Sequence, residues 1–335
     1  MDTAIVILNW NGEKMLRKYL PTLVCNTTLK DSFIVIADNG STDGSLSYVE
    51  ATFPEIRIIR FDRNYGFAGG YNRALREVDA DYYVLLNSDM EVPDGWLDPL
   101  VSFMESNPQV GVCQPKVLSL TEKDSFEYAG AAGGYIDRYG YPFCRGRILS
   151  FIEKDEGQYD TPKECFWATG ACMVVRSSLF HHLGGLDDSF FAHMEEIDFC
   201  WRAKLLGYQV WCVPQSKVYH LGGGTLPNNS PHKLYLNYRN NLLMLYKNLP
   251  ESIRSGRIFA RLCLDGASAA VYLLTFRWSY FKAVIRAHTD YRKMKRGIEP
   301  SPVEEERNNV GYYPHSIILQ FFLSGRKLRY GGLRF

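Results

Sequence analysis

The first half of the chain alternates mainly apolar runs with polar segments. Four of these runs have the length of a strand and leave few polar positions on either face: 4–8, 33–37, 56–59 and 82–86. Runs of this kind are typical of strands buried on both sides. Between the first two, apolar residues at helical spacing predict a helix over residues 13–24. The repeated strand–helix order predicts an α/β fold with a mostly parallel central sheet.

Polar residues stand where these predicted strands end. Asn9 follows the first run, Asp38 the second, and Asn87-Ser88-Asp89 the fourth. Because ligands of parallel sheets lie beyond the carboxyl ends of the strands, we expect these side chains to share one edge and to face a ligand. The alternative is that they are ordinary turn residues at the ends of strands.

A glycine-rich segment, residues 64–72, precedes an apolar pattern that predicts a helix through Ala74, Leu75 and Val78. A glycine-rich loop before a helix can present backbone N–H groups to a phosphate. The glycines do not form Gly-x-Gly-x-x-Gly, and no Gly-Lys-Ser/Thr follows, so a dinucleotide fingerprint or a P-loop is not supported. The alternative is a tight strand-to-helix connection.

The middle of the chain holds a long segment, 119–163, without clear periodicity. Such an insertion either shapes a functional surface or forms a disordered surface loop. A strand is expected over 166–176, and a helix from about Met194 that stops at Gly207. Its first turn holds three acidic side chains, which either face a pocket or only complement the helix dipole: Glu195, Glu196 and Asp198.

The last third is predicted to be helical, with a helix over 232–248 that ends before Pro250. Residues 258–278 are the most apolar stretch, but Arg261, Asp265 and Arg277 interrupt it, so it falls short of a membrane-spanning helix. It is either an interfacial helix on a membrane or a core helix. The basic, aromatic tail over 308–335 suits contact with a membrane surface or a solvated end.

Composition narrows the classes of function. The 335 residues are 46% hydrophobic and 22% charged with a net charge of +1, which gives no support for a nucleic-acid partner. Eight cysteines stand without a Cys-x-x-Cys pair, so zinc and redox motifs are not supported. The first residues show no signal-peptide pattern, and we expect a cytoplasmic protein with reduced, buried thiols.

Four motifs together resemble a known family. They are Ile7-Leu8-Asn9-Trp10-Asn11-Gly12, the segments 37–45 and 64–72, and Leu85-Leu86-Asn87-Ser88-Asp89. In this order they resemble the family 2 (GT-A fold) glycosyltransferases, and within these the rhamnosyltransferase-like group of bacterial surface-polysaccharide enzymes. The resemblance spans roughly residues 3–225. It implies a nucleotide-binding catalytic domain over 1–225 and leaves 226–335 as a helical C-terminal region that is either membrane-associated or packed on the domain.

The resemblance implies an activity as well as a fold. Family members transfer a sugar with inversion from a nucleoside diphosphate sugar, here to a hydroxyl of a lipid-linked or polysaccharide acceptor. Asp38 then matches the residue that contacts the nucleobase, and Asn9 lies beside the base. Asn64 and Asn72 flank the donor. We place three further residues with the substrate-binding set: Ser88, Gly170 and Asp198.

The resemblance also implies a metal and a base. Asp89 matches the last residue of the family's Asp-x-Asp metal motif, and Asn87 replaces the first, so one charged ligand is missing. His220 matches a histidine that completes the metal site, and Mg²⁺ or Mn²⁺ suits such ligands. Glu196 occupies the place of the catalytic base, with Glu195 as its rival. The helix dipole is expected to keep this base deprotonated at neutral pH.

Two other functions remain open at this point. A sugar nucleotidyltransferase can share an α/β sheet and an aspartate-bound metal, and a non-catalytic subunit can bind a nucleotide sugar without turnover. The glycine-rich segment 221–225 after His220 is expected to close over the donor. We expect the protein to work in the cytoplasm or on the inner face of the cell membrane.

Overall fold

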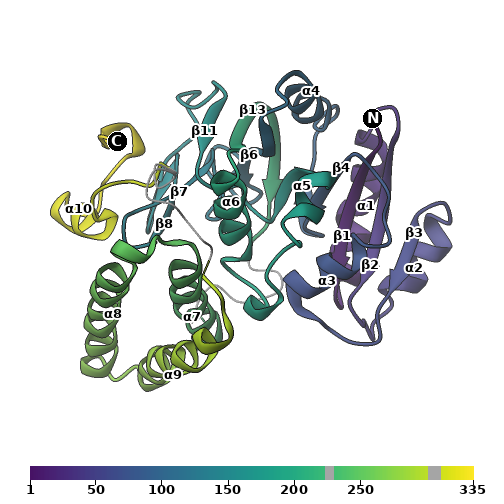
Figure 1. The fold of residues 1–335 in the computed structure, drawn as a ribbon. Coiled ribbons are helices and arrows are strands. Elements are labelled where there is room, and N and C mark those ends of the chain that lie inside the picture. Colours follow the sequence, from purple (N-terminus) through teal and green to yellow (C-terminus); the bar gives the residue numbers. More distant parts are fainter. Residues whose placement is uncertain (223–229, 301–310) are drawn as a thin grey trace.

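A computed structural model describes residues 1–222, 230–300 and 311–335 (Figure 1). Within them the main sheet has nine strands in the order β11-β13-β6-β12-β4-β1-β2-β3, with β5 paired to β13. The strands are β1 (Thr3–Asn9), β2 (Ser32–Asp38), β3 (Arg57–Arg60), β4 (Tyr82–Leu86), β5 (Met90–Glu91), β6 (Val110–Ser119), β11 (Lys163–Cys165), β12 (Cys172–Arg176) and β13 (Gln209–His220). The predicted α/β fold is confirmed.

Each central strand sends alternate side chains into two different cores. Val6 and Leu85 belong to one core, whereas Ile7 and Leu86 belong to the other. One face is covered by α1 (Glu13–Asn26), α2 (Ser45–Thr52) and α4 (Asp98–Ser106), and the other by α3 (Gly66–Ala74), α5 (Ser177–His182) and α6 (Glu195–Leu205). Burial on both faces is the reason why these strands read as unbroken apolar runs.

Strand direction changes in the middle of the sheet. The first four strands are parallel, as expected, but β12 runs antiparallel between β4 and β6. β13 pairs in parallel with β6, and the register shifts between Val213 and Lys217, so the last strand extends as far as His220. The ends of β4 and β13 therefore reach the same region of the sheet.

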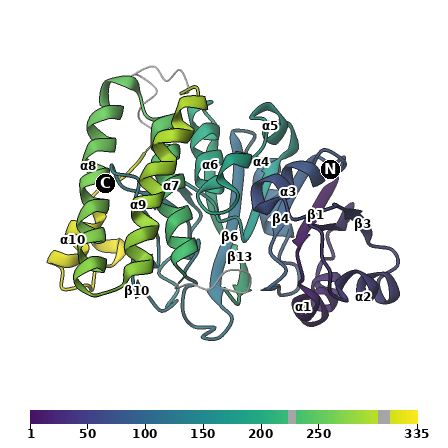
Figure 2. The same cartoon turned by 90° about the horizontal axis from the view of Figure 1, so that it is seen from below.

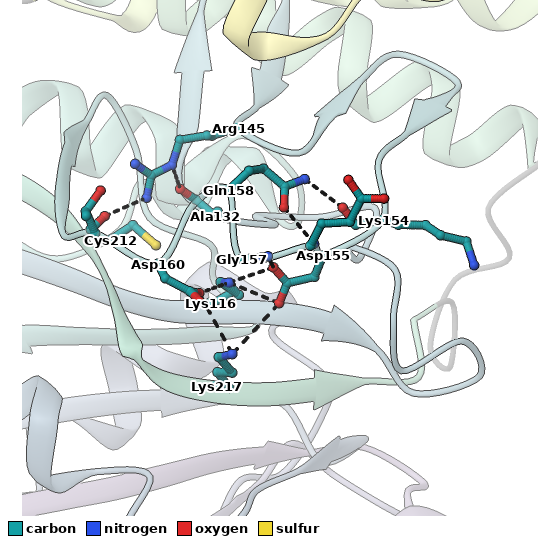
Figure 3. Close-up of polar contacts among 12 residues, drawn as sticks. Lys116, Ala132, Arg145, Lys154, Asp155, Gly157, Gln158, Asp160, Cys212 and Lys217 are labelled. Atoms are coloured by element: carbon teal, nitrogen blue, oxygen red, sulfur yellow. Dashed lines mark hydrogen bonds and ion pairs between the residues drawn. The ribbon is translucent and has the colours of Figure 1, made fainter.

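The irregular segment after β6 is folded, so the alternative of a disordered surface loop is wrong. Four short strands form an antiparallel sheet: β7 (Gly134–Ile136), β8 (Pro142–Cys144), β9 (Arg147–Ile148) and β10 (Phe151–Ile152). Lys116 on β6 anchors it: its fully buried ammonium donates to Asp155 over 2.8 Å and also bonds Asp160 (Figure 3). A buried charge of this kind is tolerated only when it is paired.

The C-terminal region is helical and lies beside the sheet, at the end opposite β3 (Figure 2). Its helices are α7 (Pro231–Asn248), α8 (Glu251–Leu274), α9 (Trp278–Met294) and α10 (Ile317–Leu323). Two main-chain donors, those of Tyr313 and Ile317, bond Ile136 and Asp137 and so tie the tail to the small sheet. The expected boundary at 225/226 lies outside the described residues, and the division into two domains stays a prediction.

Two further expectations concern the membrane and the thiols. Among the described residues, no helix is both long enough and apolar enough to cross a bilayer. Six of the eight cysteine thiols are buried, and all eight are free, as the absence of paired motifs predicted. Short connecting turns complete the description: η1 (Asp188–Phe190), η2 (Lys295–Gly297) and η4 (Tyr330–Gly332).

Candidate active site

Asn9 and Asp38 meet at the carboxyl edge of the sheet, opposite each other in the β1–β2 register. The Asn9 amide donates to Asp38 Oδ1 over 3.0 Å and to the Ser45 hydroxyl over 3.0 Å. The backbone N–H of Ser41 donates to the other Asp38 oxygen. Both side chains are buried, and Asn9 Oδ1 has no hydrogen-bond partner among the described residues. A carboxylate fixed in this way, beside an amide oxygen without a hydrogen-bond partner, is suited to accept hydrogen bonds from the N–H groups of a nucleobase.

The glycine-rich segment differs from the expectation of a loop, because Gly66 already begins α3 and the helix ends at Ala74. A Cβ at Gly70 would lie 2.7 Å from Leu8 Cδ1, so this glycine lets the helix pack closely against β1. Asn64 caps the turn: its carbonyl oxygen accepts from Gly66 N over 2.8 Å and from the Asn39 amide over 3.0 Å. The segment therefore packs α3 against the sheet, and it is also a candidate contact for the sugar donor.

Asn72 lies on α3 with its amide group engaged within the protein. Its oxygen accepts from Leu186 N over 2.9 Å, and its nitrogen donates to Leu186 O over 2.7 Å and to Asp188. These bonds fasten the segment that leads to α6. A donor contact by Asn72 stays a prediction, while its anchoring of this segment is a structural finding.

Asp89 and His220 come together from the ends of β4 and β13. Nε2 of His220 lies 3.2 Å from Oδ1 of Asp89, and the Asn87 amide lies 3.4 Å from the same nitrogen. The other ring nitrogen, Nδ1, is buried at 3.4 Å from Glu127 Oε1 without a well-aligned hydrogen bond. Burial lowers the pKa of His220, but the neighbouring carboxylates of Asp89 and Glu127 outweigh it and raise the pKa to about 10.

These side chains fit a divalent cation that is also held by substrate phosphates. Two ligands on adjacent positions of an octahedral Mg²⁺ are about 3 Å apart, and Asp89 Oδ1 and His220 Nε2 have this separation. A carboxylate behind the second ring nitrogen, as Glu127 is, orients a ligating histidine. The described residues contain no group of three or more His, Cys, Asp or Glu arranged for a metal, so the remaining ligands would come from the donor diphosphate and water. Ser88 is half-buried, and its hydroxyl would lie 3.7 Å from a Cβ at Gly12.

Glu195 and Glu196 begin α6 behind a strained turn. Phe191, His193 and Met194 all have positive φ, from 65° to 75°, which non-glycine residues adopt at a cost. One carboxylate oxygen of each glutamate, Oε2, is buried without a hydrogen-bond partner among the described residues. A buried carboxylate oxygen without a partner is suited to accept a hydrogen bond from a bound molecule. The hydroxyl group of a substrate is such a donor.

The electrostatics of this pair correct the expectation from the helix dipole. Burial raises the pKa of Glu196 to about 7, and backbone hydrogen bonds only partly oppose it. Burial, followed by the charge of Glu196, raises the pKa of Glu195 well above its usual range. Glu196 is therefore divided between its two forms near pH 7. Desolvation thus outweighs the favourable helix N-terminus.

Asp198, one helical turn further on, is directed away from this pair. It is fully buried and accepts from Arg202 over 2.8 Å, Lys247 over 3.0 Å and Asn248 over 2.7 Å. These bonds join α6 to α7. A substrate-binding role for Asp198 stays a prediction, and the structure gives it a clear role in holding α6.

The segment 170–171 lies between the metal candidates and the base candidates. Asn87 N donates to Ala171 O over 2.9 Å, and a Cβ at the adjacent Gly170 would lie 3.7 Å from Glu196 Cβ. Burial lowers the pKa of Lys233, on the first turn of α7, and the charges of Glu127 and Glu196 only partly oppose this. Short contacts thus link Asn87, the segment 170–171 and Glu196.

Residues 4–184 match the model of the family described as Glycosyl transferase family 2. The chain belongs to this family. It is a glycosyltransferase that uses nucleotide sugar donors, as the four motifs indicated.

Individual relatives agree with this membership. The chain is 26% identical over 234 residues to the N-acetylglucosaminyl-diphospho-decaprenol L-rhamnosyltransferase of Mycobacterium tuberculosis, an alignment that covers 64% of this chain and 75% of the relative. The resemblance to rhamnosyltransferases of surface-polysaccharide pathways is thereby supported at the level of sequence.

Two solved structures show the same fold. The Staphylococcus aureus TarS fragment 1-349 in complex with UDP-GlcNAc matches with a TM-score of 0.59 at 14% identity, over 98% of this chain and 88% of that one. GalNAc-T7 with UDP, GalNAc and Mn²⁺ matches with a TM-score of 0.57 at 16% identity, over 74% of this chain. The match spans only 48% of the GalNAc-T7 chain. The GT-A fold with a helical C-terminal region is confirmed.

Sequence reasoning missed several residues of the site. Asn39 joins the two donor loops, Glu127 lies behind His220, Lys233 faces both carboxylate groups, and Arg239 and Asn240 bond the strained turn. Glu127 is in a segment without periodicity, and the last three are polar residues of a helix whose sequence signal is its apolar face. The closing segment 221–225 was expected over the donor; Gly222 lies beside Glu127, and residues 223–225 are outside the described residues.

Proposed function

We propose that the chain is an inverting glycosyltransferase that moves a sugar from a nucleoside diphosphate sugar to a hydroxyl of a lipid-linked or polysaccharide acceptor. The observation that carries this proposal is the unpartnered Oε2 of Glu196, buried next to Gly170 and joined through Ala171 to the Asp89 motif. A base and an anchor for a leaving diphosphate so close together suit direct displacement at an anomeric carbon.

In the proposed reaction the ionised Glu196 takes the proton of the acceptor hydroxyl while that oxygen attacks the anomeric carbon. The new C–O bond forms on the face opposite the leaving group, and the bond to the diphosphate breaks with its electron pair. The nucleoside diphosphate departs, and the anomeric configuration is inverted. Glu195, whose pKa burial raises well above its usual range, suits the role of a hydrogen-bond donor beside the base better than that of the base.

Asp89 and His220 are the residues that would hold a divalent cation, Mg²⁺ or Mn²⁺. When bound there, the cation supplies charge neutralisation at the departing diphosphate. Asp38 and Asn9 would bind the nucleobase, and Asn64 would lie near the donor. The lipid-linked acceptor is proposed because the mycobacterial relative is named for a diphospho-decaprenol substrate.

A turnover experiment tests this proposal. The protein is incubated with UDP-, dTDP- and GDP-sugars, Mn²⁺ and membrane lipid extract, and the released nucleotide is identified. We expect nucleoside diphosphate from one donor class and an inverted anomeric signal in the product by NMR. Release of pyrophosphate would instead indicate a nucleotidyltransferase, and binding without turnover a non-catalytic subunit. If no nucleotide sugar raises the melting temperature, the donor site is wrongly assigned.

Glu196→Gln is the decisive variant, with Leu206→Gln on the exposed end of the same helix as its control. Glu196→Gln should keep donor binding in the melting assay and lose turnover by at least about 100-fold, the usual scale for a general base. Retained turnover in Glu196→Gln would contradict the assignment of the base.

A further inference from the structure

Helix α8 has its polar side turned inward. Of its four buried residues, two are charged: Arg261 and Asp265, which pair over 2.7 Å. The Arg261 guanidinium also lies 3.8 Å from the ring centroid of Tyr141, and His288 on α9 lies 3.3 Å from the second Asp265 oxygen. The charged residues that interrupt this apolar stretch are therefore paired inside the helical region.

The outward side of α8 is correspondingly free of charge. From residue 259 to residue 276, Arg261 and Asp265 are the only charged residues, and both are buried. Phe259 is 69% exposed, Val271 57% and Leu274 77%. We call this surface the outer α8 face; it comprises the exposed residues Phe259, Cys263, Gly266, Ala267, Ala270, Val271, Leu273 and Leu274. In both views α8 lies at the margin of the molecule far from β3 (Figures 1 and 2).

The turn between α8 and α9 extends this surface. Phe276 is 78% exposed and Trp278 54% exposed. Exposed basic side chains flank them: Arg277, Lys282 and Arg286, of which Arg286 pairs with Asp290 over 3.5 Å. From residue 252 to residue 289, a fully described stretch, the single acidic residue is the buried Asp265. The patch is thus apolar with a basic margin and no exposed carboxylate.

This arrangement favours one kind of partner. A large apolar patch of this sort marks an interaction surface, and soluble proteins rarely leave one uncovered. Two copies of the chain packed through this face would bring their basic margins together without acidic counterparts. Anionic lipid headgroups would neutralise those charges while the acyl boundary covers the apolar residues. Tryptophan at the edge of the patch suits the boundary between headgroups and hydrocarbon.

We propose that the outer α8 face and the α8–α9 turn dock on the surface of an anionic lipid bilayer. The helix lies in the plane of the interface, because the described residues contain no helix able to cross the bilayer. The binding itself is independent of the chemistry at Glu196. Its use, to bring the site to a lipid-linked acceptor, rests on the proposed function.

Flotation of the full chain with vesicles tests this docking. Vesicles of phosphatidylcholine alone are compared with vesicles that also contain phosphatidylglycerol. We expect binding to the anionic vesicles, and we expect Leu274→Glu to weaken it by about tenfold or more, the scale for exposing rather than burying a leucine. Lys282→Glu should weaken binding to anionic vesicles and reduce its dependence on salt. Leu206→Glu, at an exposed leucine directly after α6, is the matched control and should bind as the unmodified chain does.

Three outcomes would overturn the docking proposal. They are the absence of binding to anionic vesicles, equal binding by Leu274→Glu and Leu206→Glu, and a chain dimer that Leu274→Glu dissociates without any vesicle binding. Circular dichroism establishes that each variant is folded. The melting shift with nucleotide sugar is recorded for the same variants, so a donor shift that persists without vesicle binding refutes the docking alone. A missing donor shift with intact vesicle binding refutes the proposed function alone.

Discussion

The side-chain amide of Asn240 on α7 donates to the main-chain carbonyl of His193 over 2.7 Å, although the two residues are 47 positions apart. The same amide lies within hydrogen-bond distance of the carbonyls of Phe190 and Ala192, both at 2.9 Å. Arg239, its neighbour, donates to the Phe190 carbonyl over 3.0 Å. The left-handed residues ahead of Glu195 and Glu196 are therefore held by the C-terminal helical region.

Asn240→Ala is predicted to lower kcat by roughly tenfold or more, since a small displacement of a catalytic group has effects of this size or larger. The KM for the donor should stay within about twofold, because the proposed nucleobase contacts, Asn9 and Asp38, are on β1 and β2 and not on this turn. Steady-state kinetics with varied donor measures both. Asn107→Ala removes an amide bond to a carbonyl at the end of α4 and serves as control. A raised donor KM with unchanged kcat would contradict a positioning role.

The activity should depend on pH through Glu196, whose pKa is raised to about 7. The base acts in its ionised form, so kcat is expected to rise with pH through about 7 and then to level off. The rising limb should be absent from the residual activity of Glu196→Gln. A kcat that falls over the same interval would show that the group acts as an acid instead.

The same raised pKa predicts a change in stability of opposite sign. The unfolded chain ionises Glu196 near 4.5, whereas the folded chain ionises it near 7, so stability falls as pH rises from about 4.5 to about 7. Glu196→Gln removes this cost and should be more stable than the unmodified chain by roughly 2–3 kcal/mol at pH 8. At pH 4 the two should be alike. Urea unfolding at both pH values measures the difference, and equal midpoints at pH 8 would refute it.

Binding of Mn²⁺ should release a proton, because the cation needs the neutral imidazole and the pKa of His220 is raised to about 10. The apparent affinity is then expected to rise with pH below 10. Calorimetric titration in buffers of different ionisation enthalpy counts the protons released. Asp89→Asn and His220→Gln should each weaken Mn²⁺ binding about tenfold or more, and EDTA should abolish turnover in a way that Mn²⁺ restores. Mn²⁺ binding with the same affinity in His220→Gln would remove this residue from the metal site.

Asn72→Ala should act mainly on stability. It removes bonds to Leu186 and Asp188 and leaves the Leu186 main-chain groups without these partners. The expected loss is about 1–3 kcal/mol of unfolding free energy, the range for buried groups left unsatisfied. Denaturant unfolding measures it, with Asn26→Ala, which frees the single carbonyl of Val92, as a one-bond comparison. Unchanged stability together with weaker binding of the sugar donor would indicate that Asn72 contacts the donor instead.

Much of this site follows from the sequence because its determinants are local. Unbroken apolar runs need burial on both faces, and each such strand must end in a polar residue at the edge of the sheet. That logic brought Asn9, Asp38 and Asp89 to one edge, and the motifs around them identified the family. The first turn of α6, with Glu195 and Glu196, was likewise predicted from an apolar stripe that ends at Gly207.

Tertiary structure decided what depends on contacts between distant segments. The antiparallel direction of β12, the bonds of Asn72 and Asp198, and the place of Glu127 behind His220 all join residues from separate elements. The charge state of Glu196 depends on how deeply packing buries its carboxyl group. This burial cannot be inferred from its position in the helix alone. The charges of Arg261 and Asp265 broke the apolar stretch in the sequence, but their pairing inside the fold is what leaves the outer α8 face apolar.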